Sequence, residues 1–145
     1  MVRPSFHPLR SLAIQRTFFT AIFLAVLLPL HPVVQAGVLR EHPGRWLGTL
    51  NIPGGPSLRL GAEVFTRADG SLWASVASPD QDAYDIPVAG IREHGQTAVL
   101  DLSFAVLTLT WAGDRFAGEW KQGPAPLAFE LKKTANFPMK ARAQT

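Results

Sequence analysis

The chain contains no cysteine, which excludes disulfide bonds and thiolate chemistry. Many small exported domains depend on disulfides, so this one has to be held together by packing alone. Structural zinc sites use cysteine and histidine ligands, and only His42 and His94 follow residue 36. We therefore expect no metal site. At 145 residues the chain has room for one ordinary domain.

The first 36 residues have the pattern of a secretory signal. A basic start without acidic residues precedes an apolar run at 18–30. Val34 and Ala36 are small residues at the exit, which places the cut between Ala36 and Gly37. We expect a helical signal peptide at 1–36 and a secreted or periplasmic product with no stable membrane anchor after cleavage. An uncleaved anchor is the alternative, but the apolar run is shorter than the roughly 20 residues that a spanning helix needs.

The basic excess of the chain lies in this same segment. The whole chain has 14 basic and 11 acidic residues, and three arginines but no acid precede the cut. The mature part therefore holds 11 residues of each sign, and its formal net charge is zero. The alkaline isoelectric point is no argument for nucleic-acid binding, and we expect no nucleic-acid partner.

After residue 44 the chain is typical of short β-strands. Apolar and polar residues alternate, and turn residues interrupt the alternation at short intervals. We expect an all-β domain of about eight antiparallel strands with no helix after Ala36. Short connections favour a small up-and-down barrel that closes on itself, with a β-sandwich as the alternative. The expected strands span 45–52, 58–67, 72–78, 87–92, 97–104, 106–111, 115–122 and 127–131.

No catalytic motif is recognisable in the mature part. Nucleophilic hydrolysis needs a serine beside a histidine that a carboxylate orients, and no serine lies in a G-x-S-x-G motif. We expect no enzymatic activity and no cofactor. The alternative is a cryptic serine hydrolase that uses Ser78 or the aspartates of the loop at 78–85. Those aspartates could also hold Ca²⁺, but the further ligands of a calcium loop are missing.

Aromatic residues recur on nearly every expected strand. They could simply fill a small eight-stranded barrel, whose interior side chains alone can occupy. They could instead line a pocket for an apolar ligand. For that second case the candidate ligand-binding residues are Trp73, Phe104, Trp111 and Trp120.

Several stretches, taken in order, resemble a known family. Gly44, Trp46 and their neighbours have the G-x-W form that opens the first strand of lipocalin-like barrels. The whole set resembles the lipocalin-like domain found in front of secreted bacterial α/β-hydrolases of the serine-aminopeptidase or esterase type, and beside β-lactamase-like serine hydrolases. The resemblance covers 37–134 and leaves a basic, flexible tail at 135–145. The stretches are 44–48, 58–60, 78–81, 86–88, 118–123 and 126–127.

The resemblance implies a lipocalin-like barrel in a periplasmic or extracellular setting, without the hydrolase and its catalytic residues. It also implies a basic side chain stacked on the first-strand tryptophan, which assigns Lys133 to Trp46 as a structural cation–π contact. We expect a non-catalytic exported domain that binds a protein partner or a small apolar ligand. A subunit that serves an exported hydrolase encoded elsewhere is an alternative.

Overall fold

The computed structural model of the protein describes residues 36–139, which belong to one compact unit, Val34–Thr145. The expected signal peptide at 1–36 lies, except for Ala36, outside the described residues, and so does the end of the tail at 140–145. Within the described range, no helix is long and apolar enough to cross a membrane.

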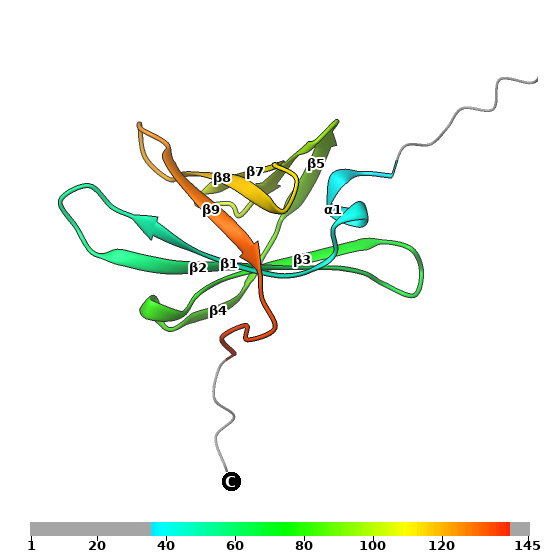
Figure 1. The fold of residues 1–145 in the computed structure, drawn as a ribbon, viewed down its shortest axis with the longest axis horizontal. Coiled ribbons are helices and arrows are strands. Elements are labelled where there is room, and N and C mark those ends of the chain that lie inside the picture. The colour runs from blue at the N-terminus through cyan, green and yellow to red at the C-terminus, as the bar shows by residue number, and fades with distance from the viewer. Residues whose placement is uncertain (1–35, 140–145) are drawn as a thin grey trace, which may run out of the picture. The chain divides into compact units, whose positions relative to one another are not determined.

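The described residues form an almost entirely β structure, as the alternation predicts. Nine strands follow one another along the chain, with one short α-helix before them and one 3-10 turn among them (Figure 1). The helix α1 spans Val38–Glu41, and the 3-10 turn η1 spans Pro79–Gln81. The strands are β1 Gly44–Asn51, β2 Ser57–Thr66, β3 Leu72–Ser78, β4 Ala83–Pro87, β5 Gly90–His94, β6 Thr97–Asp101, β7 Val106–Trp111, β8 Arg115–Lys121 and β9 Leu127–Lys133.

The strands form a single antiparallel sheet in the order β4-β3-β2-β1-β9-β8-β7-β6-β5. Strands consecutive in sequence are neighbours everywhere except at the β4–β5 connection. The first strand pairs with the last, as expected, and this seam places Trp46 opposite Lys133 and Gly48 opposite Leu131. The pairing of β1 with β9 joins the two halves of the chain into one curled sheet.

The sheet curls into a half-barrel and does not close, which corrects the expected closed barrel. Strands β4 and β5 are its two edges. Figure 1 shows β1 to β4 on one side and β5 to β9 on the other. Both edge strands have only five residues, and β4 ends on Pro87, which has no N–H to offer a further strand. The short edges limit pairing with other chains.

The strand β4 occupies a segment that the sequence pattern assigns to a loop, so the strand count is nine and not eight. The aspartates at 78–85 are typical of turns, and two of them do adopt positive φ, 50° at Asp82 and 51° at Asp85. The chain nevertheless pairs with β3 through Ile86 and Ala83, with a register shift between Val76 and Ser78. An irregular ladder of this kind accommodates residues that a regular strand would exclude.

The helix α1 is a second correction, because no helix was expected after Ala36. Its Val38 and Leu39 are fully buried in the same core as the strands. The backbone N–H of Leu39 donates to Oε1 of Glu93 on β5 at 2.8 Å, and Arg40 Nη1 donates to the carbonyl of Gly70 at 2.6 Å. A single turn is too short to show helical periodicity in the sequence, so the pattern does not predict it. It is also too short to be stable alone, and its burial and these contacts stabilise it.

The core lies on the concave face of the sheet. Strand pattern and burial agree there, because residues two apart along β2, β7 and β8 are buried in turn. The largest fully buried side chains are apolar, and most of them come from strands on both sides of the seam, among them Trp46, Leu107, Phe116 and Leu131. Packing of the two sides against each other replaces the disulfides that the chain lacks.

The beginning of the expected tail lies against the sheet. The backbone N–H of Thr134 donates to the carbonyl of Arg45 at 2.9 Å. Phe137 lies over Gly61 on the convex face of β2, where a methyl group in place of the glycine hydrogen would overlap the phenyl ring. Residues 135–139 therefore continue along the sheet after β9 ends.

Candidate functional site

A cavity of about 520 Å³ lies at one end of the half-barrel. Its walls come from the β1–β2 and β8–β9 hairpins, from the end of β3 with η1 and β4, and from Phe104 between β6 and β7. Figure 1 shows these hairpins on the side of the sheet away from α1. The volume falls within the range of about 300–1,000 Å³ that is usual for small-molecule sites.

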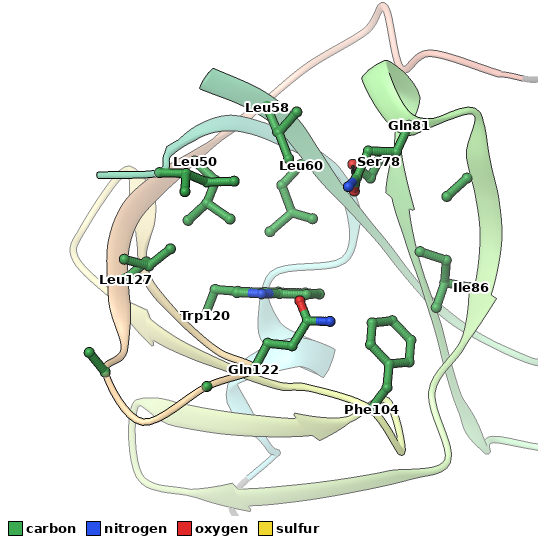
Figure 2. Close-up of a pocket in the computed structure, with 14 residues that line it drawn as sticks. Leu50, Leu58, Leu60, Ser78, Gln81, Ile86, Phe104, Trp120, Gln122 and Leu127 are labelled. Atoms are coloured by element: carbon green, nitrogen blue, oxygen red, sulfur yellow. Dashed lines mark hydrogen bonds between the residues drawn. The ribbon is translucent and has the colours of Figure 1, made fainter. Parts of the chain in front are cut away.

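The lining of the cavity is apolar and carries no charged side chain. Leucines from β1 and β2 form one wall, Ile86 of β4 another, and Leu127 of β9 a third (Figure 2). The polar side chains are Ser78, Gln81 and Gln122. Ser78 is buried, and its Oγ donates to Oε1 of Gln81 at 2.8 Å. The leucines are Leu50, Leu58 and Leu60.

Two of the four aromatic residues expected to bind a ligand meet in this cavity. Trp120 is only 8% exposed, whereas Phe104 is 52% exposed. Their ring centroids are 6.2 Å apart, with the planes tilted by 60°. In Figure 2 the indole of Trp120 lies across the cavity, and Phe104 and Gln122 lie beside it. The pair provides a buried aromatic surface and an exposed one at the opening.

Trp73 does not reach the cavity. It lies opposite Phe65 in the β2–β3 pairing, and the two rings stack at 6.0 Å with planes 20° apart. Its neighbours Ala74 and Val76 point to the core, so Trp73 points to the convex face. Phe65 is 38% exposed. These two residues form an aromatic pair on the outside of the sheet.

Trp111 also lies apart from the cavity, in an aromatic cluster with three other rings. His42 stacks on Trp111 at 3.6 Å with planes 14° apart. Trp46 and Phe116 meet Trp111 edge-on, at 5.8 Å and 5.2 Å. This cluster fills the core next to the seam, so its role in the fold is packing.

The contact that the lipocalin resemblance assigns to Lys133 is present at the seam. Lys133 Nζ lies 5.6 Å from the centroid of the Trp46 ring, and the two residues are opposite each other on β9 and β1. Trp46 is 2% exposed, so the ammonium group of Lys133 covers a ring that is otherwise surrounded by protein. A contact of this type contributes roughly 0.5–1 kcal/mol at exposed sites.

The groups considered for hydrolysis do not assemble around Ser78. The Ser78 hydroxyl donates to an amide oxygen, which cannot accept a proton as a base does. His42 is stacked on Trp111 and is not among the residues that line the cavity. Asp80 is held by Arg59 on β2, through two guanidinium bonds of 2.9 Å and 2.6 Å and one backbone bond of 2.7 Å.

The hydrogen bonds from the Arg59 side chain, and after them the bond from its backbone N–H, lower the pKa of Asp80 below its ordinary value of 3.8. A carboxylate whose pKa is depressed in the folded state stabilises the fold above its unfolded pKa, and this contribution disappears as the pH falls through the folded pKa. We therefore expect the attachment of η1 to β2 to be intact at neutral pH and to be lost only below about pH 4.

An NMR titration of the Arg59 backbone amide would follow this attachment. The amide resonance should shift in the wild type as the pH falls below about 4 and should show no such step in Asp80→Asn. Asp82→Asn is the matched control, since asparagine tolerates the positive φ at that position. An equal loss of the step in both variants would contradict the assignment to Asp80.

Most residues that line the cavity were not predicted from the sequence, among them the leucines, Ile86 and the two glutamines. Alternation along 58–67 does place Leu58 and Leu60 on one face, but it does not show that this face surrounds a space.

Among residues 36–139, no three histidine, aspartate or glutamate side chains gather as metal ligands would. Comparison of the chain with protein-family models, with curated proteins and with solved structures found no match.

Proposed function

We propose that this domain binds a small, uncharged and mainly apolar molecule in the cavity between its hairpins, as a non-catalytic exported protein. The observation that carries the proposal is an apolar space of about 520 Å³ without a charged residue in its lining. Burying a charge without a partner is costly, so this lining favours a neutral ligand over an anion or cation.

The polar groups of the cavity suggest how such a ligand would be oriented. Gln81 uses its side-chain oxygen to accept from Ser78, which leaves its two amide N–H donors for another partner. Gln122 lies across the cavity beside Trp120 and offers both a donor and an acceptor (Figure 2). A hydroxyl, ester or amide head group fits these neutral partners, and an acyl or cyclic apolar body fits the leucine walls.

A titration with the neutral fluorescent probe N-phenyl-1-naphthylamine tests this proposal. We expect saturable binding, and displacement of the probe by a long-chain alcohol at concentrations about ten-fold lower than those needed for the carboxylate of equal chain length. The absence of saturable probe binding, or equal displacement by the acid and the alcohol, would argue against an uncharged-ligand site.

Phe104 and Phe65 provide a matched pair of variants for the same titration. Both are exposed phenylalanines, but only Phe104 lines the cavity. Because a buried phenyl group contributes about 1.5–3 kcal/mol, Phe104→Ala should weaken probe binding about ten-fold, while Phe65→Ala should leave it unchanged. Weakening of similar size in both variants would point to non-specific adsorption on exposed aromatic surface.

A second candidate function is docking to a protein partner such as an exported hydrolase, in the manner of the lipocalin-like accessory domains. The Phe65–Trp73 pair on the convex face supports it, since an exposed aromatic pair is typical of contact surfaces. The two candidates are separable, because partner capture would depend on Phe65 and ligand binding on Phe104.

A further inference from the structure

Glu93 of β5 is pressed against the first residues of the mature chain. Its Oε1 accepts the backbone N–H of Leu39 at 2.8 Å. A methyl group added to the Cα of Gly37 would overlap the same carboxylate, so the Glu93 side chain lies directly against this residue. Ala36, Gly37 and Glu93 also line one polar cavity of about 340 Å³ together with Arg40 and Glu41. The carboxylate therefore lies beside the exact residue at which the signal pattern predicts the new N-terminus.

The nitrogen of Gly37 is necessarily close to this carboxylate. The nitrogen and an added Cβ would be bonded to the same Cα and would lie about 2.5 Å apart. Because such a Cβ would overlap the carboxylate, the nitrogen lies at most about 4–5 Å from the Glu93 oxygens. In the uncut chain this nitrogen belongs to a peptide bond with Ala36. Hydrolysis of that bond adds one water: Ala36 keeps a carboxylate, and Gly37 gains an amino group. Its pKa is about 7.7–8.0, so most of it is an ammonium at neutral pH.

We propose that Glu93 is the binding site for the α-ammonium group of Gly37 created when the chain is cut between Ala36 and Gly37. The ammonium has three donors where the peptide had one, and an ionised donor bonded to a carboxylate makes a stronger hydrogen bond than a neutral one. The other charged residues that line this polar cavity are Arg40 and Glu41. Arg40 donates to the carbonyl of Gly70. Glu93 is the carboxylate that already accepts a hydrogen bond from this part of the backbone.

The pairing would secure α1 at the end of the half-barrel opposite the ligand cavity. Val38 and Leu39, directly after Gly37, are fully buried, and α1 contacts β2, β5 and β6. The helix therefore bridges strands on both sides of the open sheet. Removal of the signal would thus strengthen the contact that holds the two sides together, and this inference does not depend on ligand binding.

The proposal concerns the cut chain, so the test uses protein that begins at Gly37, which keeps every helix and strand of the described residues. Three forms are compared by thermal unfolding: a free amine at Gly37, an N-acetylated Gly37, and a chain that begins at Ala36. The acetyl group stands where the Ala36 carbonyl lies, so it fits the structure and removes only the charge. We expect the free-amine form to melt about 5 °C above the acetylated form, with the Ala36 form close to the acetylated one.

Glu93→Gln should abolish the difference between the free and acetylated forms, and Glu41→Gln, which changes the neighbouring acid, should preserve it. If Glu93→Gln does not fold, amide exchange at Leu39 in the wild-type forms decides, since exchange should be slower with the free amine. Equal melting temperatures, a difference that persists in Glu93→Gln, or equal Leu39 exchange would overturn the proposal. So would a different first residue in the exported full-length chain, as found by mass spectrometry.

Discussion

Trp120→Ala should abolish probe binding and lower the free energy of unfolding by about 3–5 kcal/mol. Trp120 lies between Leu107 of β7 and Leu127 of β9 in the sheet and is 8% exposed. Its removal would merge the space of the indole with the cavity, and the neighbouring Leu107 and Leu127 would lose their contacts with the indole. Chemical denaturation gives the stability change, and a parallel titration with the naphthylamine probe gives the binding change.

Trp73→Ala is the matched control for this variant. It removes an indole from the same sheet, but from the partly exposed convex face. Its loss should cost less stability, and probe binding should be kept. Because domains of this size have a total stability of about 5–15 kcal/mol, circular dichroism has to establish that Trp120→Ala is folded at the temperature of the titration. Retained probe binding in folded Trp120→Ala would remove Trp120 from the site.

Gly48→Ala should destabilise the protein by about 1–3 kcal/mol, because the added methyl group would overlap the backbone carbonyl of Glu130. A backbone group in the middle of a strand cannot turn aside as the end of a side chain can. Gly48 is also the last residue of the β1–β9 seam, which pairs only Trp46 to Gly48 with β9. The substitution therefore forces apart the one pairing that joins the two ends of the chain.

Gly123→Ala is the control for Gly48→Ala. Gly123 lies in the β8–β9 hairpin with no atom within 4 Å of an added methyl group, so its melting temperature should change little. Gly48→Ala should melt about 5–20 °C lower than the wild type, as a loss of this size implies for a domain of about 100 residues. Similar melting temperatures for the two alanine variants would show that β1 and β9 can separate at Gly48 without cost.

Much of the fold follows from local sequence patterns. The alternation of apolar and polar residues predicts most of the strands correctly. Each strand has one face on the core, and side chains of a strand point to opposite faces in turn, so buried residues recur with a period of two. The chain turns at 68–70, between the strands expected at 58–67 and 72–78: Gly70 has a φ of 83°, and the Asp69 carboxylate accepts from Ser71 at 2.9 Å and 2.6 Å. The Ser71 hydroxyl and then its backbone N–H lower the pKa of Asp69.

The sequence pattern fails where contacts between distant residues decide the structure. Segment 78–85 has the composition of a loop, yet Asp80 is held by Arg59, which is far away in sequence, and the following residues add a strand to β3. Helix α1 is similarly secured by Glu93, 54 positions from Leu39. Secondary-structure propensity depends only on residues that are close in the sequence, so it cannot predict either of these contacts.

The candidate site shows the same division. The sequence does not distinguish the four candidate ligand-binding residues, since all are aromatic and lie in or beside expected strands: Trp73, Phe104, Trp111 and Trp120. In the structure, Phe104 and Trp120 line one cavity. Trp73 lies on the convex face, and Trp111 lies in the aromatic cluster around Trp46. Alternation tells which residues share a face, but not which end of a curled sheet leaves a space between its walls.

The amino-acid sequence alone therefore determined the all-β character, the antiparallel succession of strands and the lack of any disulfide support. These properties depend on alternation, turn residues and composition, which act over a few neighbouring positions. Only the tertiary structure decided that the sheet remains open between β4 and β5, that α1 covers one end, and that the other end holds an uncharged cavity. Curvature, closure and empty space arise from how distant strands meet, and no local pattern records them.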